Sequence, residues 1–138
     1  MNVLLSIKPE FARKILRGEK EYEFRRTTFR DPSIVDRVFL YATTPVQRIL
    51  GFFLFSDVLT GRPEDLWKRC SDASGLEDRQ RFMAYFSGAD TGFAYAIDRV
   101  EPFAEPLDPR QHVDEFRPPI SFTYLNGEFD GLRQFRAE

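Results

Sequence analysis

The hydrophobic pattern at the start of the chain changes from a period of two to a helical period. Every second side chain in residues 3–8 is apolar, which is typical of a half-buried strand. Pro9 then suits the first position of a helix, where its missing N–H costs nothing, and Gly18 suits the residue after a helix end. Between them, apolar side chains recur at helical spacing, at Phe11, Ala12, Ile15 and Leu16. The pattern predicts a strand, a short helix and a tight turn.

Residues 21–26 return to a period of two, but only one of their two faces is apolar. Tyr22 and Phe24 share the face that we expect to pack on the core. The opposite face carries Glu21, Glu23 and Arg25. Charged strand faces are commonly solvated, so these side chains either form an ion pair at the mouth of a small barrel or bind a ligand.

The rest of the chain predicts more strands with helices between them. Strand-like runs cover residues 39–42, 49–59, 93–103 and 118–125, and helical patterns cover 63–70 and 76–87. Pro102, Pro106 and Pro109 are expected to end the run that starts at residue 93. No βαβ unit repeats, which argues against a parallel doubly wound sheet. We predict an α+β, mainly β fold: a small, mostly antiparallel β-barrel with flanking short helices, as one domain over residues 1–125, followed by a C-terminal tail over 126–138.

Composition narrows the classes of protein that are compatible with this fold. The chain has 138 residues, of which 42% are hydrophobic and 15 are Phe, so one domain with an aromatic core is expected. A single cysteine and a single histidine exclude a disulfide framework and a Cys/His zinc site within the chain. We interpret Cys70 as a buried hydrophobe and His112 as a surface residue, and we expect no metal and no cofactor. A secretory signal pattern and a membrane-spanning apolar run are both absent, so we expect a cytoplasmic protein.

Charge is distributed unevenly along the chain. Residues 1–30 hold eight basic and four acidic side chains, although the net charge of the whole chain is −2. A local basic field attracts phosphates even on an acidic protein, so this segment suggests an anionic partner. A solvated helix rich in Lys and Arg gives the same count, and both interpretations stay open at this point.

Polar side chains around the first two predicted strands would converge if these strands were neighbours in the sheet. The set comprises Ser6 and Lys8 on the first strand, Lys20 in the turn, and Glu23 and Arg25 on the second strand. In such a cleft the carboxylate could accept hydrogen bonds from an exocyclic amine, and the guanidinium could hold a carbonyl or a phosphate with two donors. The competing interpretation is an ion pair between Glu23 and Arg25 within the sheet, with Lys20 at the surface.

Tyr41 and Ser121 are two further candidates for ligand binding. Each could supply a hydroxyl at the cleft, and each fits equally well as an ordinary strand-end residue. A glycine-rich phosphate loop, a nucleophile elbow and a kinase signature are all absent from the sequence.

The set of residues around the turn resembles the N-terminal signature of the ASCH domain, a family of the PUA-like superfamily, as found in small stand-alone bacterial and archaeal proteins. The match comprises Ser6-Ile7-Lys8-Pro9, then Gly18, Lys20, Glu23 and Arg25 in the pattern Gly-x-Lys-x-x-Glu-x-Arg, and segments at 41–46, 94–97 and 118–122. The resemblance implies a small β-barrel with a cleft beside the motif, and binding of RNA or modified bases. It also implies that Ser6, Lys8, Lys20, Glu23 and Arg25 line that cleft.

Some members of this family are enzymes, which the resemblance brings in as an alternative. In small amidohydrolases that act on N4-acetylcytidine, a threonine nucleophile stands where this chain has Glu23. A carboxylate cannot replace that hydroxyl as the acyl acceptor, so the mechanism does not transfer intact. Other members are ribonucleases, for which Lys20, with Tyr41 or Ser121, would stabilise charge or transfer a proton.

Three functions therefore stay open, and the first is favoured. It is a module that binds RNA, a nucleotide or a modified nucleoside, in which Lys8, Lys20 and Arg25 engage phosphate or base carbonyl groups. The second is a metal-independent hydrolase, either a ribonuclease or a nucleoside amidohydrolase, with Glu23 as general base toward water and Lys20 as the group that stabilises the oxyanion. The third is an accessory domain with a protein partner in transcription or translation. The oligomeric state does not follow from the sequence.

Overall fold

Six strands form one curled sheet in the computed structural model, which describes residues 1–73 and 78–125. The strands are β1 (Val3–Ile7), β2 (Tyr22–Arg25), β3 (Val38–Ala42), β4 (Arg48–Gly61), β5 (Gly92–Leu107) and β6 (Phe122–Tyr124). They lie side by side in the order β2-β5-β4-β3-β1-β6. Neighbouring strands are antiparallel except β1 and β3, which are parallel. This mixed, mostly antiparallel half-barrel with short helices confirms the predicted fold class.

Three α-helices accompany the sheet in the described residues. Helix α1 (Pro9–Leu16) connects β1 to β2. Helices α2 (Pro63–Cys70) and α3 (Arg79–Tyr85) both lie between β4 and β5 in the sequence. Single 3-10 turns cover Pro32–Ile34, Ser71–Ala73 and Pro109–Gln111. Proline opens α1 and α2, as the sequence predicts. α3 is shorter than the predicted helix, because Asp78 caps it by accepting a hydrogen bond from the backbone N–H of Gln80 at 2.8 Å. Residues 76 and 77 of that prediction fall outside the described residues.

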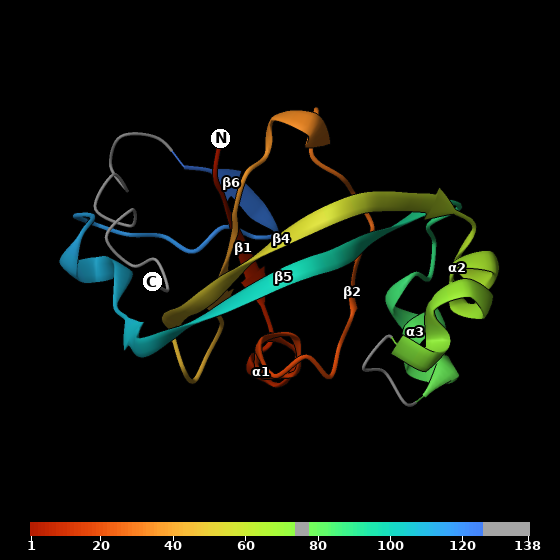
Figure 1. The fold of residues 1–138 in the computed structure, drawn as a ribbon, viewed down its shortest axis with the longest axis horizontal. Coiled ribbons are helices and arrows are strands. Elements are labelled where there is room, and N and C mark those ends of the chain that lie inside the picture. The colour runs from red at the N-terminus through yellow and green to blue at the C-terminus, as the bar shows by residue number, and fades with distance from the viewer. Residues whose placement is uncertain (74–77, 126–138) are drawn as a thin grey trace.

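β4 and β5 form a long ribbon that crosses the molecule, with α2 and α3 at one end of it (Figure 1). The prediction that the strand starting at residue 93 ends near residue 103 is wrong, since β5 continues to Leu107. Pro102 pairs with Gly51 where the register shifts, so the missing proline N–H breaks no regular ladder bond. Gly51 has a φ of 157°, and a side chain there would overlap the carbonyl oxygen of Glu101, so this close approach requires glycine.

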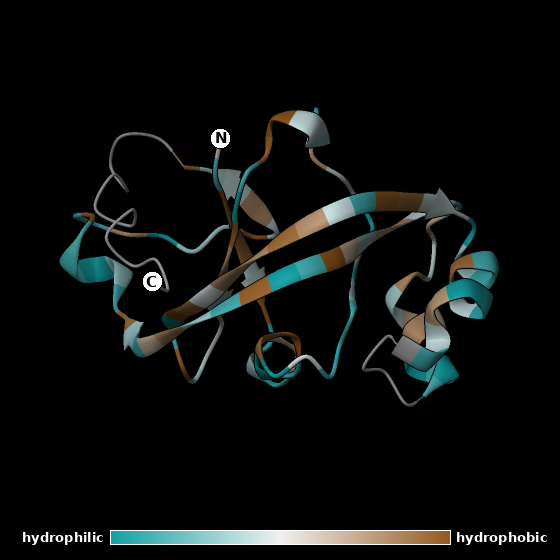
Figure 2. Cartoon of the chain, viewed as in Figure 1, coloured by the Kyte–Doolittle hydropathy of each residue, from teal (hydrophilic) through white to brown (hydrophobic). Residues whose placement is uncertain are grey.

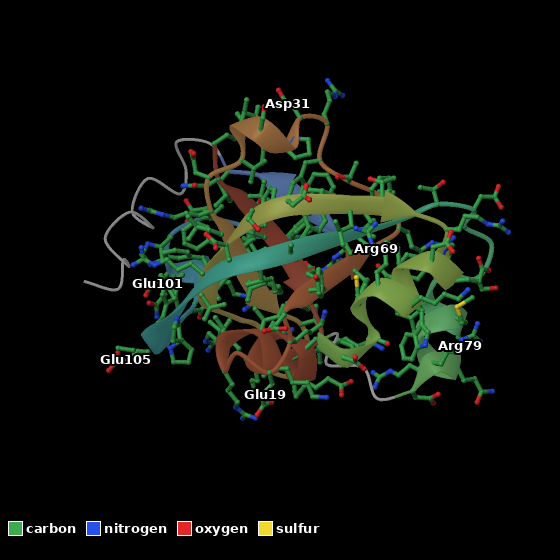
Figure 3. All side chains as sticks on the ribbon, turned by 45° about the vertical axis from the view of Figure 1, so that its right-hand side comes forward. Glu19, Asp31, Arg69, Arg79, Glu101 and Glu105 are labelled. Carbon is green, nitrogen blue, oxygen red and sulfur yellow. The ribbon has the colours of Figure 1, made fainter. Side chains whose placement is uncertain are left out.

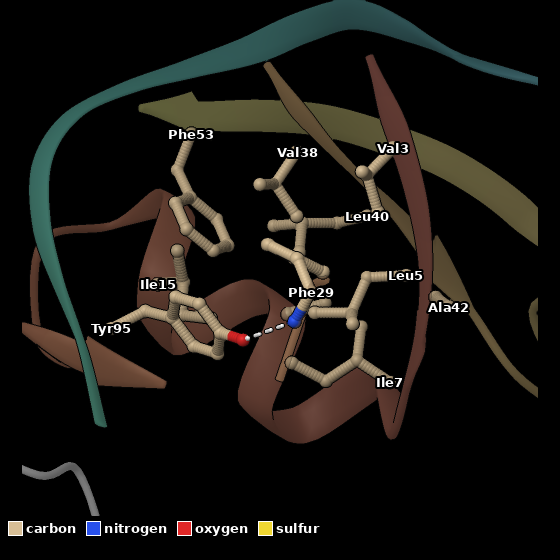
Figure 4. Packing of buried hydrophobic residues seen from close by; sticks show 11 residues of the cluster. Val3, Leu5, Ile7, Ile15, Phe29, Val38, Leu40, Ala42, Phe53 and Tyr95 are labelled. Atoms are coloured by element: carbon tan, nitrogen blue, oxygen red, sulfur yellow. Dashed lines mark hydrogen bonds between the residues drawn. The ribbon is translucent and has the colours of Figure 1, made fainter. Parts of the chain in front are cut away.

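Hydrophobic side chains are buried on both faces of the sheet and under the helices. One cluster lies between α1 and the strands and includes Phe29 (Figure 4). A second cluster includes Phe39 and Tyr41, whose side chains leave β3 on the opposite face. The third packs α2 and α3 against β2 and β5, and here the rings of Phe24 and Phe82 have centroids 4.9 Å apart. Helix α1 is hydrophobic on the side that faces the sheet and hydrophilic on its outer side (Figure 2).

Burial decides several expectations about single residues. Phe24 is 5% exposed and Cys70 is 1% exposed, which confirms their predicted place in the core, and His112 is exposed as expected. β6 covers only the end of the predicted 118–125 strand, because the two prolines that start this run donate no ladder hydrogen bonds. Within residues 1–73 and 78–125, every helix is too short or too polar to cross a bilayer.

Candidate nucleotide-binding cleft

A cleft of about 620 Å³ opens where the N-terminal end of the fold meets α3. Its walls come from the end of β1, from α1, from the turn and strand β2 that follow it, and from α3. The lining residues are Ser6, Ile7, Lys8, Phe11, Lys20, Glu23, Phe24, Arg25, Thr43, Arg81, Ala84, Tyr85 and Ile120. This volume lies within the range of small-molecule and cofactor sites in proteins. Charged, aromatic and aliphatic side chains all face it.

The cleft wall contains a buried group of three charged residues. Labelled charged side chains such as Arg79 and Glu105 point away from the fold (Figure 3), but Lys20 is 3% exposed and Glu23 is 5% exposed. Lys20 Nζ lies 3.0 Å from Glu23 Oε1, and Arg25 Nε lies 2.9 Å from Glu23 Oε2. Glu23 therefore binds one cation with each of its carboxylate oxygens. The prediction of Lys20 as a surface residue is wrong, and that of an ion pair between Glu23 and Arg25 is confirmed, although this pair lines a cleft.

The surroundings of Lys20 are unusual for an ammonium group. Its Nζ also donates a hydrogen bond to the carbonyl oxygen of Tyr22, and it lies 5.0 Å from the ring centroid of Phe24 and 6.0 Å from that of Phe11. Burial lowers the pKa of Lys20 below its ordinary value of 10.5, and the neighbouring Glu23 carboxylate opposes this shift. The amine consequently loses its proton at a lower pH than an exposed lysine does.

β1 and β2 come together at the cleft without being neighbours in the sheet. The predicted cleft depends on β1 and β2 being adjacent strands, and this condition is wrong, because β5, β4 and β3 lie between them in the strand order. The curl of the sheet closes the gap, so that Arg25 Nη2 donates a hydrogen bond of 2.7 Å to the backbone oxygen of Ser6. Ser6 Oγ in turn donates to the carbonyl oxygen of Pro119 at 2.6 Å. Arg25 thus joins two strands that are far apart in the hydrogen-bonded order of the sheet.

The structure brings together five of the seven predicted binding residues. Ser6, Lys8, Lys20, Glu23 and Arg25 all line the cleft, with Lys8 exposed at its edge. Tyr41 and Ser121 do not line it, although both adjoin Ser6: Tyr41 pairs with it in β3, and the carbonyl oxygen of Ser121 accepts its backbone N–H at 2.9 Å. Tyr41 is 1% exposed, and its hydroxyl has no hydrogen-bond partner among the described residues.

Several lining residues were not predicted from the sequence. Phe11, Thr43, Arg81, Tyr85 and Ile120 come from four separate segments, so only the folded chain collects them. The one local signal is the spacing of Arg81 and Tyr85, which are four residues apart and therefore share a face of α3. Among residues 1–73 and 78–125, no group of three His, Cys, Asp or Glu side chains is arranged to hold a metal ion.

The curled half-barrel and the cleft with its Gly-x-Lys-x-x-Glu-x-Arg motif are those of a small PUA-like domain. The chain is 32% identical over 127 residues to an ASCH domain-containing ribonuclease of Zymomonas mobilis, covering 91% of this chain and 84% of that protein. The protein therefore belongs to the ASCH domain family.

Solved structures agree with this family assignment. The crystal structure of ASCH from Zymomonas mobilis superimposes with a TM-score of 0.87 at 29% identity, covering 99% of this chain and 96% of that one. A variant of that protein in which a tyrosine is replaced by phenylalanine gives the same TM-score at 28% identity, with 99% of each chain covered. No protein-family profile matches the chain.

Proposed function

We propose that this protein is a ribonuclease that binds a nucleotide of single-stranded RNA in the cleft and cleaves the chain beside it. The observation that supports this proposal is the buried group of Lys20, Glu23 and Arg25 on the wall of a nucleotide-sized cleft. The second support is that the similar protein of Zymomonas mobilis is named a ribonuclease. The binding of RNA, favoured from the sequence, is the first half of this activity.

Arg25 is well suited to hold a phosphate. A guanidinium has five N–H donors in a planar fork, and Glu23 and Ser6 use two of them here. These two contacts fix the plane of the fork, so the other donors meet a phosphate without first losing side-chain freedom. Lys8 adds a mobile positive charge at the edge of the cleft, where it steers the polyanion inward.

Lys20 is the residue that we assign to proton transfer. In the proposed step the 2′ oxygen of the bound nucleotide attacks the adjacent phosphorus, and its proton passes to the neutral amine of Lys20. The bond from phosphorus to the 5′ oxygen breaks, and that oxygen takes a proton from solvent, which leaves a 2′,3′-cyclic phosphate and a 5′-hydroxyl. A lysine with a lowered pKa has a larger neutral fraction near pH 7 than an exposed one, and so is the better base.

Glu23 then has a positioning role instead of the amine-reading or water-activating roles considered from the sequence. Each of its carboxylate oxygens already accepts a hydrogen bond from a cation. It holds the charged groups of Lys20 and Arg25 side by side on the wall of the cleft. The amide hydrolysis known for threonine-containing ASCH enzymes lacks its nucleophile here.

Tyr41 and Ser121 stay predicted contributors to the same reaction. Both adjoin Ser6 at the cleft edge, and the buried Tyr41 hydroxyl has no partner among the described residues.

The test separates binding from cleavage by using two forms of one fluorescent oligonucleotide. Cleavage is measured on unmodified RNA in the presence of EDTA, and affinity is measured on the 2′-O-methyl form, which cannot be attacked by its own 2′ oxygen. Lys20→Met is expected to lower the cleavage rate at least a hundredfold and to change affinity little. Arg25→Gln is expected to weaken binding about tenfold. Lys68→Met, at an exposed position of α2, and Arg62→Gln, at the exposed residue before α2, are the matched controls.

Each outcome of this test has a defined meaning. Cyclic phosphate ends that depend on Lys20 support the ribonuclease. Binding that depends on Arg25 without cleavage reduces the protein to an RNA-binding module. Equal activity of all variants, or no interaction with RNA, overturns the proposal. Release of acetate from N4-acetylcytidine by the unmodified protein, but not by the Lys20 variant, would instead favour the amidohydrolase.

A further inference from the structure

α3 presents two side chains to the cleft that the ribonuclease chemistry above does not use. Arg81 and Tyr85 are four residues apart on one face of the helix, and both line the cleft. The Arg81 side chain is 46% exposed, and Tyr85 is 42% exposed. A charged group and an aromatic ring, both accessible and one helical turn apart, match the two parts of a nucleotide, the phosphate and the base.

Arg81 is held by α1 across the edge of the cleft. Its Nη2 atom lies 2.5 Å from Glu10 Oε1, and its guanidinium carbon lies 4.8 Å from the ring centroid of Phe11. The Glu10 carboxylate is 48% exposed, and ion pairs in such positions contribute little to stability because water screens them. Arg81 therefore exchanges the carboxylate for another anion at little cost, while Phe11 still supports its planar group.

Apolar surface beside these charges is left open to solvent. Ile120, in the segment before β6, is fully exposed although it lines the cleft, and the Tyr85 ring packs by its edge on Phe86 at 4.9 Å. The edge contact fixes the orientation of the Tyr85 ring. A nucleobase that lay against Tyr85 and Ile120 would remove both side chains from water.

We infer that Arg81, Tyr85 and Ile120 form a nucleotide-recognition rim, in which the base packs on Tyr85 and Ile120 while Arg81 leaves Glu10 and binds the phosphate. Glu10 then competes with the RNA for Arg81 and sets the affinity of the site. This inference rests on the proposed function and deepens it, because it names an exposed base with its attached phosphate as the recognised unit. The burial of Lys20 and Glu23 on the cleft wall leaves this rim as the accessible place for a base.

The inference predicts a gain of affinity, which a merely structural role of Glu10 would not produce. In anisotropy titrations with the 2′-O-methyl oligonucleotide, Glu10→Gln is expected to tighten binding about twofold to fivefold, because the competing carboxylate charge is removed. Arg81→Gln is expected to weaken binding about tenfold and to lower the slope of log affinity against log salt by about one. In the Arg81→Gln background, Glu10→Gln is expected to have no further effect.

The base contact is tested by Tyr85→Leu and Ile120→Ser in the same titrations. Tyr85→Leu is expected to weaken binding at least about fivefold, the lower end for loss of one aromatic stacking partner, and Tyr85→Phe to recover most of that loss. Arg79→Gln is the matched control, because Arg79 is an exposed arginine of the same helix that does not line the cleft. Thermal unfolding of each variant shows whether it is folded at the temperature of the titration.

The outcomes distinguish this inference from the proposed function. Weaker binding by Arg25→Gln together with unchanged binding by the Arg81 and Tyr85 variants overturns the rim and leaves the ribonuclease standing. The rim is also overturned if Glu10→Gln weakens binding, or if Arg79→Gln weakens it as much as Arg81→Gln does. Absence of RNA binding by the unmodified protein overturns both.

Discussion

Removal of the Glu23 carboxylate is expected to destabilise the protein far more than removal of the Lys20 ammonium, although the two groups form one ion pair. Glu23 binds two cations, Lys20 at 3.0 Å and Arg25 at 2.9 Å. Among the described residues, Lys20 has one carboxylate partner and otherwise contacts the carbonyl oxygen of Tyr22 and two aromatic rings. Glu23→Gln therefore leaves two cations facing each other beside the cleft, whereas Lys20→Met leaves Glu23 paired with Arg25.

The distances set the size of this asymmetry. At an effective dielectric constant of 20, each charge pair near 3 Å gives roughly 5 kcal/mol of gross attraction. Most of this offsets the cost of taking the charges out of water, and the loss of one partner from a buried pair typically costs about 3–5 kcal/mol. Lys20→Met removes both an attraction and a desolvation cost, so its net effect is expected to stay within about 1–2 kcal/mol. The expected difference between the two variants is at least about 2 kcal/mol.

Urea unfolding at pH 7, followed by the fluorescence of Trp67 and by circular dichroism, measures both free energies of unfolding. Trp67 is the single tryptophan of the chain and packs on Phe82, so its signal reports the α2–α3 region. The double variant Lys20→Met/Glu23→Gln completes the cycle and is expected to regain part of the loss, with a coupling energy of about 1–3 kcal/mol. Equal destabilisation by the two single variants, or a larger effect of Lys20→Met, would refute the assignment of Glu23 as the anchor of both cations.

Three further predictions concern Lys20, Gly51 and Cys70. The pKa of Lys20 is lowered in the folded protein, so the unfolded chain binds more protons in the alkaline range below pH 10.5. The free energy of unfolding of the unmodified protein, relative to that of Lys20→Met, should therefore rise with pH across this range. An unchanged difference between the two proteins from pH 7 to pH 10 would contradict this. Gly51→Ala should lower stability by more than about 2 kcal/mol, because the new Cβ overlaps backbone at Glu101, whereas the exposed Gly18→Asn should cost much less. Cys70 should react with a thiol reagent only as fast as the protein unfolds locally, since burial raises its pKa and leaves it 1% exposed. If Cys70 of the folded protein reacted as fast as a free thiol does, the third hydrophobic cluster would not shield it from solvent.

Local periodicity was sufficient for most elements of the fold. The apolar alternation before Pro9, the helical spacing up to Leu16 and the alternation after Gly18 all correspond to elements of the structure at nearly the predicted bounds. Such patterns work because each face of a strand or helix meets one environment along its whole length. The end of β5 was not predicted correctly, because it depends on a residue of another strand. Pro102 is tolerated within β5 only because Gly51 on the partner strand makes a bulge there.

The candidate site was predictable as a set of residue types and only in part as an arrangement. The Gly-x-Lys-x-x-Glu-x-Arg spacing places Lys20, Glu23 and Arg25 within one turn and one short strand, so their mutual contacts follow from a few consecutive residues. Whether they are solvated or buried does not follow, because the Lys20 ammonium lies near the ring of Phe11 on α1 as well as that of Phe24 within the motif.

The sequence by itself determined the order of the elements, the family of the domain and the charged residues of the motif, all of which depend on neighbours in the chain. Only the tertiary structure decided that β1 and β2, separated by three strands in the sheet, meet through Arg25 and Ser6. It also brought Arg81, Tyr85 and Ile120 to the same cleft from distant segments. The physical reason is the curl of the sheet: twist accumulates from strand to strand and brings β2 back against β1, which no local pattern encodes.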